Sequence, residues 1–338
     1  MLYFHDATSL EHDPRVLSPE HPDSPTRIEA VEATMAAAGW PGCERRPAPA
    51  APEPQLALAH TIAHVESIRE LCLAGGGQID EDTFVGEPSY RAALHAAGGA
   101  CAMVRALLRG ESRTGFCAVR PSGHHATADR AMGFCLFNNI AIAAELAVRE
   151  LGVSRVLIVD WDVHHGNGTA EIFRRRRDVL VASIHQSGLF PGTGAVTDAG
   201  SGDGHGYTIN IPVPRGSDEE VWLSVLEYVI VPVGEQFRPE LVLVSAGFDA
   251  HADDPLGECL LDAESFAKMA RHVRDLALQA GAPIGAVLEG GYDPGALAAS
   301  VLATIRALDG EGEADSIAPD PLVTSRIAAH VSHHWSLL

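Results

Sequence analysis

Four short runs of apolar and β-branched residues, without alternating polar positions, constrain the fold of this chain more than any other feature. They lie at residues 155–160, 179–184, 241–246 and 284–289. A strand buried on both faces has this pattern, whereas a strand with one solvated face alternates apolar and polar residues. The four runs therefore predict strands of a parallel sheet that is covered on both faces.

Longer stretches with helical spacing of apolar residues separate these runs. Asp218 and Asp262 are suited to N-cap two of them, and Pro294 suits the first turn of another. Strand–helix alternation of this kind predicts a three-layer α/β/α fold with a mainly parallel sheet between the helices. The stretches expected to be helical are residues 138–151, 218–236, 263–280 and 294–308.

The length of 338 residues allows one large domain or two smaller ones. We expect one main domain over residues 1–310, followed by a linker and a short helix over residues 311–338 that pack on the same domain. The Pro- and Ala-rich stretch from Pro47 to Pro54 predicts a loop. The Gly-rich segment from Gly188 to Gly206 is long for a loop, which indicates a function or an ordering ion.

The net charge of −21, from 45 acidic and 24 basic residues, argues against a partner such as nucleic acid. Binding to phosphates needs clustered cations, and the one such run, Arg174 to Arg177, falls near the end of an expected short helix, where arginines suit the helix dipole. The acidic balance is compatible with a cationic ligand, and it also fits a role in solubility alone.

The N-terminus has neither the basic nor the apolar segment of a signal peptide, and no run reaches the ~18 apolar residues of a membrane span. We therefore expect a cytoplasmic protein that does not contact membranes. The cysteines form no CxxC pair, so we expect small buried hydrophobic residues rather than disulfides or a zinc ribbon. They are Cys43, Cys72, Cys101, Cys117, Cys135 and Cys259.

Chemically active side chains follow two of the expected strands. Asp160, Asp162 and His164 come directly after the first run, and Asp249 follows the run at 241–246. Residues two apart in an extended segment share a face, and ligands of open α/β sheets gather at the carboxyl ends of the strands. Asp162, His164 and Asp249 therefore predict a catalytic metal site with an open position, because a structural site would be closed.

A second group combines tandem histidines with a tyrosine. His124 and His125 lie in a Gly/Pro loop after the strand-like residues 115–119, and Tyr292 lies in the Gly-Gly-Tyr turn after the last strand. Each histidine needs a partner that fixes its tautomer, and Asp160 and Asn167 are the unassigned polar residues of the metal motif. A metal that activates water, a histidine base and a tyrosine hydroxyl near the oxyanion together indicate amide hydrolysis.

With these motifs, the chain resembles the histone deacetylase superfamily. It is most similar to the class II branch, with its bacterial histone deacetylase-like amidohydrolases and acetylpolyamine amidohydrolases. The resemblance extends from Tyr3 to about Leu308. The matching strings are HPDSPTR (21–27), RPSGHHA (120–126), GFCLFNN (133–139), VDWDVHHGNGT (159–169), FPGTG (190–194), SAGFDAHADDPLG (245–257) and LEGGYD (288–293).

The resemblance implies an arginase/deacetylase-like fold, with a single eight-stranded sheet and residues 1–310 as the catalytic domain. It implies one catalytic Zn²⁺, held by Asp162, His164 and Asp249. It implies that His125 is the general base, that Asp160 supports His124, that Asn167 supports His125, and that Tyr292 polarises the acetyl carbonyl. Arg27 would lie near an internal cavity for acetate exit. The residues implied to line the substrate tunnel or its rim are Gly123, Phe134, Phe190, Leu256 and Gly290.

The resemblance also implies one or two structural potassium ions. One site would use Asp160, Asp162, His164 and Ser183, partly through backbone carbonyls. The second would use carbonyls near Phe173, Arg176, Val179 and Tyr207. Fe²⁺ or Co²⁺ would also suit two carboxylates and one imidazole as the catalytic metal. A homo-oligomer is compatible with the sequence.

Three positions depart from related patterns. Asn167 stands where many class I members have Asp, so we expect a lower pKa for His125 than an Asp partner would give. Glu289 replaces a glycine of the class I tyrosine loop. Binuclear ureohydrolases such as arginase carry a second aspartate where this chain has His251, so we expect no second catalytic metal.

Three functions remain open at this point. The first is deacetylation of acetyl-lysine in peptides or proteins, and the second is deacetylation of acetylpolyamines or another small acylated amine. Leu256 stands where polyamine-selective relatives place a glutamate, although Glu11, Asp13 and Asp82 could supply acidic groups from other loops. The third is a catalytically weak acyl-lysine-binding protein, against which Tyr292 argues.

Overall fold

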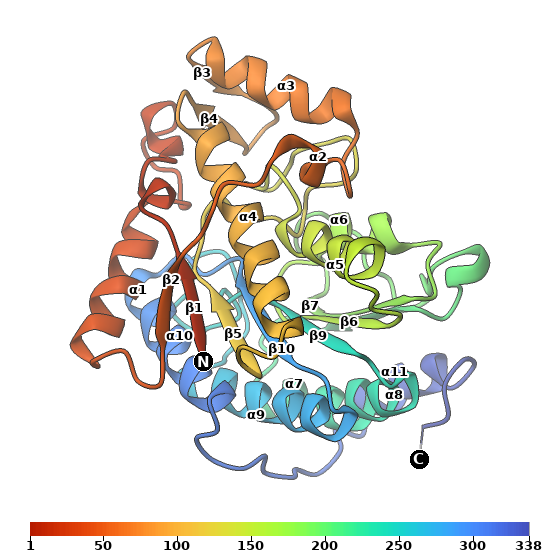
Figure 1. The fold of residues 1–338 in the computed structure, drawn as a ribbon. Coiled ribbons are helices and arrows are strands. Elements are labelled where there is room, and N and C mark those ends of the chain that lie inside the picture. The colour runs from red at the N-terminus through yellow and green to blue at the C-terminus, as the bar shows by residue number, and fades with distance from the viewer. Residues whose placement is uncertain (338) are drawn as a thin grey trace.

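A single sheet of eight parallel strands forms the centre of the molecule (Figure 1). The structure, a computed structural model, describes residues 1–337. The prediction of one mainly parallel eight-stranded sheet is confirmed, and every pairing within this sheet is parallel. In spatial order the strands are β2 (Glu44–Pro47), β1 (Leu2–His5), β5 (Thr114–Cys117), β10 (Ile284–Leu288), β9 (Leu241–Ala246), β6 (Val156–Asp160), β7 (Val179–Gln186) and β8 (Thr208–Val213).

The four apolar runs form β6, β7, β9 and β10, all of them interior strands whose residues are entirely buried. Consecutive residues of β6 point to opposite faces of the sheet. Leu157 and Val159 join one apolar cluster, whereas Val156 and Ile158 join the other. Burial on both faces therefore explains why these strands show no polar alternation. A separate antiparallel hairpin pairs β3 (Gly76–Gln78) with β4 (Phe84–Gly86).

Helices cover both faces and complete the three layers (Figure 1). One face carries α2 (Glu53–Leu56), α3 (Ile62–Leu73), α4 (Ser89–Leu108), α5 (Asn139–Glu150) and α6 (Asn167–Phe173). The other carries α1 (Thr26–Ala37), α7 (Glu219–Val225), α8 (Val231–Phe237), α9 (Ala263–Ala280), α10 (Pro294–Leu308) and α11 (Val323–Val331). Short 3₁₀ turns lie at η1 (Ala7–Leu10), η2 (Pro14–Val16) and η3 (Gly202–Gly204).

The predicted helix caps are confirmed. Asp218 accepts a hydrogen bond from the Val221 N–H, and Asp262 forms a capping box with Ser265. Pro294 occupies the first turn of α10. The single helix expected over 218–236 is instead interrupted, because a π-helical stretch, η4 (Leu226–Ile230), separates α7 from α8.

The loop expected from Pro47 to Pro54 is shorter than predicted. Pro47 ends the edge strand β2, and Pro54 lies in the one-turn helix α2. Proline is tolerated at both places, because neither an edge strand nor the first turn of a helix needs a hydrogen bond from the N–H that proline lacks. Among residues 1–337, every helix is too short or too polar to span a lipid bilayer.

The segment after residue 311 ends in α11. Ile327 and Val331 of this helix are buried in the same apolar cluster as α7 and α9. The hydroxyls of Ser224 and Thr324 lie 2.6 Å apart and link α7 to α11. Of the arginine run, Arg174 pairs with Asp198, and Arg176 pairs with Glu145 and Asp178.

Candidate metal and catalytic site

The carboxyl ends of four neighbouring strands bring the predicted residues together. The tandem histidines follow β5, the Gly-Gly-Tyr turn follows β10, Asp249 follows β9, and Asp160 ends β6. These strands are consecutive in the sheet, so segments far apart in sequence meet at one edge. This is the edge at which open α/β sheets bind their ligands.

Three potential ligand atoms converge at this edge. The ligand atoms of Asp162, His164 and Asp249 all lie within 4.8 Å of one another. The Nδ1 atom of His164 lies 2.9 Å from Asp249 Oδ2 and 3.2 Å from Asp162 Oδ1. Both carboxylates are fully buried. Two buried carboxylates and one imidazole around a single point form a donor set that suits a divalent cation such as Zn²⁺.

Backbone amides hold the outer carboxylate oxygens of this triad. The Val163 N–H donates to Asp249 Oδ1 at 2.7 Å, and the Gly290 N–H donates to Asp162 Oδ2 at 2.8 Å. A Cβ atom on Gly290 would lie only 2.2 Å from Asp249 Oδ2 and 2.5 Å from Asp162 Oδ2. Position 290 therefore requires glycine, because only a residue without a side chain lets the backbone approach the two carboxylates this closely.

The buried charges of the triad perturb the pKa values of its members. Burial, followed by the charge of Asp162, raises the pKa of Asp249 to about 7. Burial disfavours a charged His164, but its hydrogen bonds to the two carboxylates outweigh burial and raise its pKa to about 10. The structure thus stabilises positive charge at the point where the three ligand atoms meet, as a metal site does.

The tandem histidines have the partners that the sequence predicted. His124 Nδ1 lies 3.0 Å from Asp160 Oδ2, and His125 Nδ1 lies 2.8 Å from Asn167 Oδ1. Burial opposes a charged His124, but Asp162 and Asp160 raise its pKa well above the ordinary value. Burial and the charge of His124 hold the pKa of His125 well below the ordinary value. The two adjacent rings therefore favour opposite charge states.

Tyr292 lies between an aromatic ring and a buried cation. Its ring meets Phe134 edge-on at 5.6 Å, and the Arg27 guanidinium lies 4.7 Å from its centroid. Burial raises the pKa of Tyr292 well above the ordinary value although Arg27 opposes this, so the hydroxyl stays protonated and can donate a hydrogen bond. Asp254 Oδ2 accepts the Tyr292 N–H at 2.6 Å and fixes the turn.

Two of the residues predicted to line the tunnel pack beside His125 and Tyr292. The Phe190 ring meets the His125 ring edge-on at 5.0 Å, and Phe190 is 38% exposed, while Phe134 contacts Tyr292. Leu256 is partly buried, and its N–H donates to Asp254. Gly123 differs from Gly290 in its surroundings. A Cβ atom on Gly123 would meet the backbone of residues 137–139 rather than the carboxylates of the triad.

The residues predicted to hold potassium are arranged in two places. Asp160 pairs in register with Ser183 of the neighbouring strand, beside the triad. In the second group, the Phe173 carbonyl accepts the Arg176 N–H, and the Tyr207 carbonyl accepts an N–H from β7, where Val179 begins the strand. A carbonyl oxygen has two lone pairs, so these bonds leave one free on each.

The supporting roles of several residues at the site were not predicted from the sequence. Asp23 is buried between Arg27 and Arg120, with Oδ1 2.7 Å from both guanidinium groups. Asp254 holds the backbone at Tyr292, and Glu289 holds the histidine loop. A carboxylate next to glycine or proline in a buried turn is the signal they share. That signal is weak, because an accepted backbone N–H leaves no trace in residue type.

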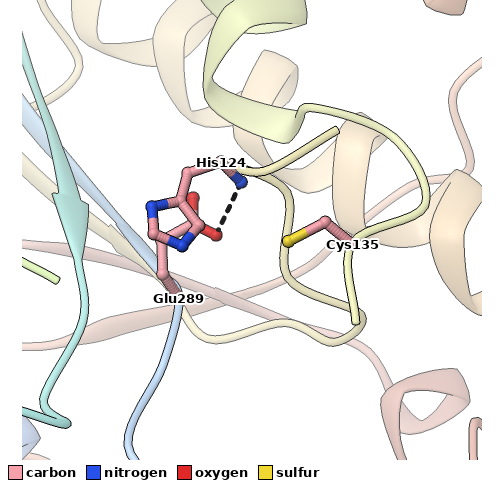
Figure 2. A group of neighbouring side chains, drawn as sticks. All are labelled: His124, Cys135 and Glu289. Carbon is pink, nitrogen blue, oxygen red and sulfur yellow. Dashed lines mark hydrogen bonds between the residues drawn. The ribbon is translucent and has the colours of Figure 1, made fainter. Parts of the chain in front are cut away.

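His124, Cys135 and Glu289 form a second cluster of potential ligand atoms (Figure 2). Its chemistry does not suit a cation. Glu289 Oε2 already accepts the N–H groups of Gly123 and His124, at 2.7 and 3.1 Å. Burial raises the pKa of the Cys135 thiol well above its ordinary value, which keeps the sulfur protonated. N–H donors aimed at one point favour an anion there, so the carboxylate itself is the occupant.

A family model described as a histone deacetylase domain matches residues 21–308. The chain belongs to the histone deacetylase family. Membership confirms the resemblance seen in the motifs and makes the protein a hydrolase of the deacetylase type. A probable deacetylase of Methanothermobacter thermautotrophicus is 46% identical over 282 residues, which cover 82% of this chain and 83% of that protein.

Two further relatives agree with this family. A histone deacetylase-like amidohydrolase of Pseudomonas aeruginosa is 40% identical over 293 residues, covering 86% of this chain and 77% of its own. The solved structure titled "Crystal Structure of HDA15 HD domain" is 35% identical, with a TM-score of 0.92, and covers 99% of this chain and 94% of that chain. The arginase/deacetylase-like fold is thereby confirmed.

Substituting Gly290 by alanine should weaken metal binding. The added Cβ would displace the carboxylates of Asp162 and Asp249, so we expect affinity for Zn²⁺ to fall by about 10- to 100-fold. Isothermal titration of metal-depleted protein measures this. Gly295→Ala, in the exposed first turn of α10, is the matched control and should bind as wild type. Equal affinity in both variants would contradict the assignment of Gly290.

Substituting Asn167 by aspartate should shift the pH dependence of turnover. A carboxylate in place of the amide oxygen that lies 2.8 Å from His125 Nδ1 favours the charged ring and raises its pKa. A general base must be neutral, so the acidic limb of kcat/KM should move to higher pH. The profile is measured between pH 5 and 9. An acidic limb that stays in place would count against His125 as the base.

Proposed function

We propose that this protein is a zinc-dependent amidohydrolase that removes acetyl groups from acetyl-lysine side chains. One observation carries the proposal above all. Asp162, His164 and Asp249 converge within 4.8 Å at the same sheet edge as the tandem histidines and Tyr292. Family membership supports the deacetylase chemistry.

The three convergent residues would hold the metal, and the donor set suits Zn²⁺ while also accepting Fe²⁺ or Co²⁺. When bound, the ion would polarise the acetyl carbonyl and lower the pKa of a water molecule. We infer further that His251, beside Asp253 rather than at the triad, holds no second catalytic ion.

His125 is the general base in this proposal. Its depressed pKa keeps the ring neutral and able to accept a proton, and Asn167 Oδ1 accepts from Nδ1–H, so that Nε2 carries the free lone pair. His124 has a carboxylate partner and a raised pKa, which suit it to stay charged beside the reacting groups. The Tyr292 hydroxyl, held protonated, donates a hydrogen bond to the developing oxyanion.

The flanking aromatic rings suit a narrow apolar substrate. Phe134 and Phe190 pack against Tyr292 and His125 on the two sides of the site. We propose that they enclose the alkyl stem of the acylated amine, with Gly123, Gly290 and Leu256 completing the wall and the rim. Arg27 is fully buried and bonded to Asp23, which fits a structural role near an acetate exit path.

The charges around the expected opening favour a peptide over a polyamine. Glu11 forms an ion pair with Arg91, and Asp13 binds Arg15 through both oxygens at 2.8 Å. Burial and neighbouring Asp80 raise the pKa of Asp82. Two of the three acids predicted for this role are therefore already paired with arginines, which disfavours their use for an extended polycation. Tyr292 in the site argues against a weak acyl-lysine reader.

We also propose that residues 1–310 form the catalytic domain and that residues 311–338 pack on it through α11. One or two potassium ions would stabilise the site. Asp160 beside Ser183 supports the first, and the carbonyls of Phe173 and Tyr207 support the second. A cytoplasmic location and the substrate as partner, without nucleic acid or membrane, complete the proposal.

A substrate panel tests this function. Zinc-loaded protein is assayed for kcat/KM on acetyl-lysine peptides, trifluoroacetyl-lysine peptide, acetylputrescine and acetylspermidine. Because Glu11 and Asp13 are paired with arginines, we expect peptides to exceed polyamines by about tenfold or more, which corresponds to about 1.4 kcal/mol. Polyamine turnover tenfold above peptide would overturn the choice of substrate. If protein with stoichiometric zinc releases amine from none of these substrates, the proposed reaction is wrong.

A further inference from the structure

Glu289 is a buried acidic residue at the site that has no role in the proposed reaction. It lies directly after β10, three residues before Tyr292, and is completely buried. Its Oε2 atom accepts two backbone hydrogen bonds, from the Gly123 N–H at 2.7 Å and from the His124 N–H at 3.1 Å. Figure 2 shows the second of these bonds. A buried carboxylate costs stability unless such donors satisfy it, so its presence demands an explanation.

The main chain of the same residue is also held by hydrogen bonds. The Glu289 carbonyl oxygen accepts a hydrogen bond from Arg27 Nη2 at 2.5 Å and another from Ser122 Oγ at 3.1 Å. Arg27 in turn is fixed by Asp23. Residue 289 therefore joins the histidine loop through its side chain and through the Ser122 contact, and it joins the N-terminal region through the Arg27 contact.

These contacts link the two parts of the catalytic machinery. Gly123 and His124 begin the segment that carries His125, and Glu289 begins the turn that carries Tyr292. Without the carboxylate, only the Ser122 contact to the Glu289 carbonyl would remain among the hydrogen bonds described here between the two segments. A displacement of about 1 Å at a catalytic group can cost about 100-fold in rate.

We propose that Glu289 is a positioning residue, whose carboxylate sets the tandem-histidine loop against the tyrosine turn. The inference rests on the proposed deacetylase function, since the base and the oxyanion donor belong to that scheme. The role is geometric rather than electrostatic. Burial raises the pKa of Glu289 to about 7, yet the neutral acid would still accept both N–H groups through its carbonyl oxygen.

Two substitutions of Glu289 separate the effect of its hydrogen bonds from the effect of its charge. Glutamine keeps one carbonyl oxygen, which can replace Oε2 and accept both N–H groups. Its amide nitrogen would replace Oε1, where Ser245 Oγ lies 3.4 Å away and can accept a hydrogen bond. Leucine has a similar size and no acceptor. Glu289→Gln thus removes the charge and retains both bonds, whereas Glu289→Leu removes both the charge and the bonds.

The test compares these variants as zinc-loaded full-length proteins on the best wild-type substrate. We expect kcat of Glu289→Leu to fall by about 30- to 100-fold, with KM and bound zinc close to wild type. Glu289→Gln should stay within about fivefold, with the acidic limb of its pH profile in place. Ser224→Ala removes a buried acceptor of the Asp320 N–H far from the site and is the control for lost stability alone. Its kcat should equal wild type.

Two results would overturn the proposal. In the first, Glu289→Leu has wild-type kcat. In the second, Glu289→Gln loses as much as leucine and its acidic limb shifts, which would assign the role to charge. If Glu289→Leu does not fold, Glu289→Ala replaces it and must show the same order of activities.

An activity-independent measurement separates this inference from the proposed function. In ¹H–¹⁵N spectra, the Gly123 and His124 amide protons should resonate downfield in wild type and Glu289→Gln and move upfield in Glu289→Leu. This pattern is expected even if no acylated amine proves to be a substrate. Unchanged amide signals in Glu289→Leu would remove the structural basis of the inference.

Discussion

Buried negative charge at one edge of the sheet is the constraint on which the rest of this structure depends. Asp160, Asp162, Asp249 and Glu289 are all completely buried there. Isolated carboxylates cannot remain ionised in such surroundings unless positive charge or hydrogen-bond donors compensate them. The structure supplies His124 to Asp160, N–H groups to Glu289, and His164 between the other two. In the proposed function, a divalent cation at the triad would complete this compensation.

The same compensation orders the catalytic groups. Asp162 and Asp160 raise the pKa of His124 and so favour its charged form. A charged His124 in turn lowers the pKa of neighbouring His125 and favours its neutral form. Behind Tyr292, the pair of Arg27 and Asp23 fixes the turn through the carbonyls of residues 289 and 291. The proposed chemistry would therefore depend on a network that reaches from the N-terminal helix region to the last strand. Neutral Asn167 belongs to this balance, since a second carboxylate there would favour a charged base.

Much of this could be predicted from the sequence, because its signals are local. Unbroken apolar runs identified β6, β7, β9 and β10, and spacing of two residues after a strand placed Asp162 and His164 on one face. The edge strand β2 was not predicted, because its residues Glu44–Pro47 are mostly exposed and carry no apolar pattern. The acceptor roles of Glu289 and Asp254 could not be predicted either. They bind backbone N–H groups from distant segments, and only the fold brings those groups within reach.

The claim that a cation compensates these carboxylates is tested most directly by zinc binding to Asp249→Ala, beside wild type. Metal-depleted proteins are titrated with Zn²⁺, and bound metal and turnover are measured on the same samples. The account predicts one tightly bound ion per wild-type chain, and the loss of both tight binding and turnover in Asp249→Ala. Stoichiometric zinc with retained turnover in that variant would contradict it.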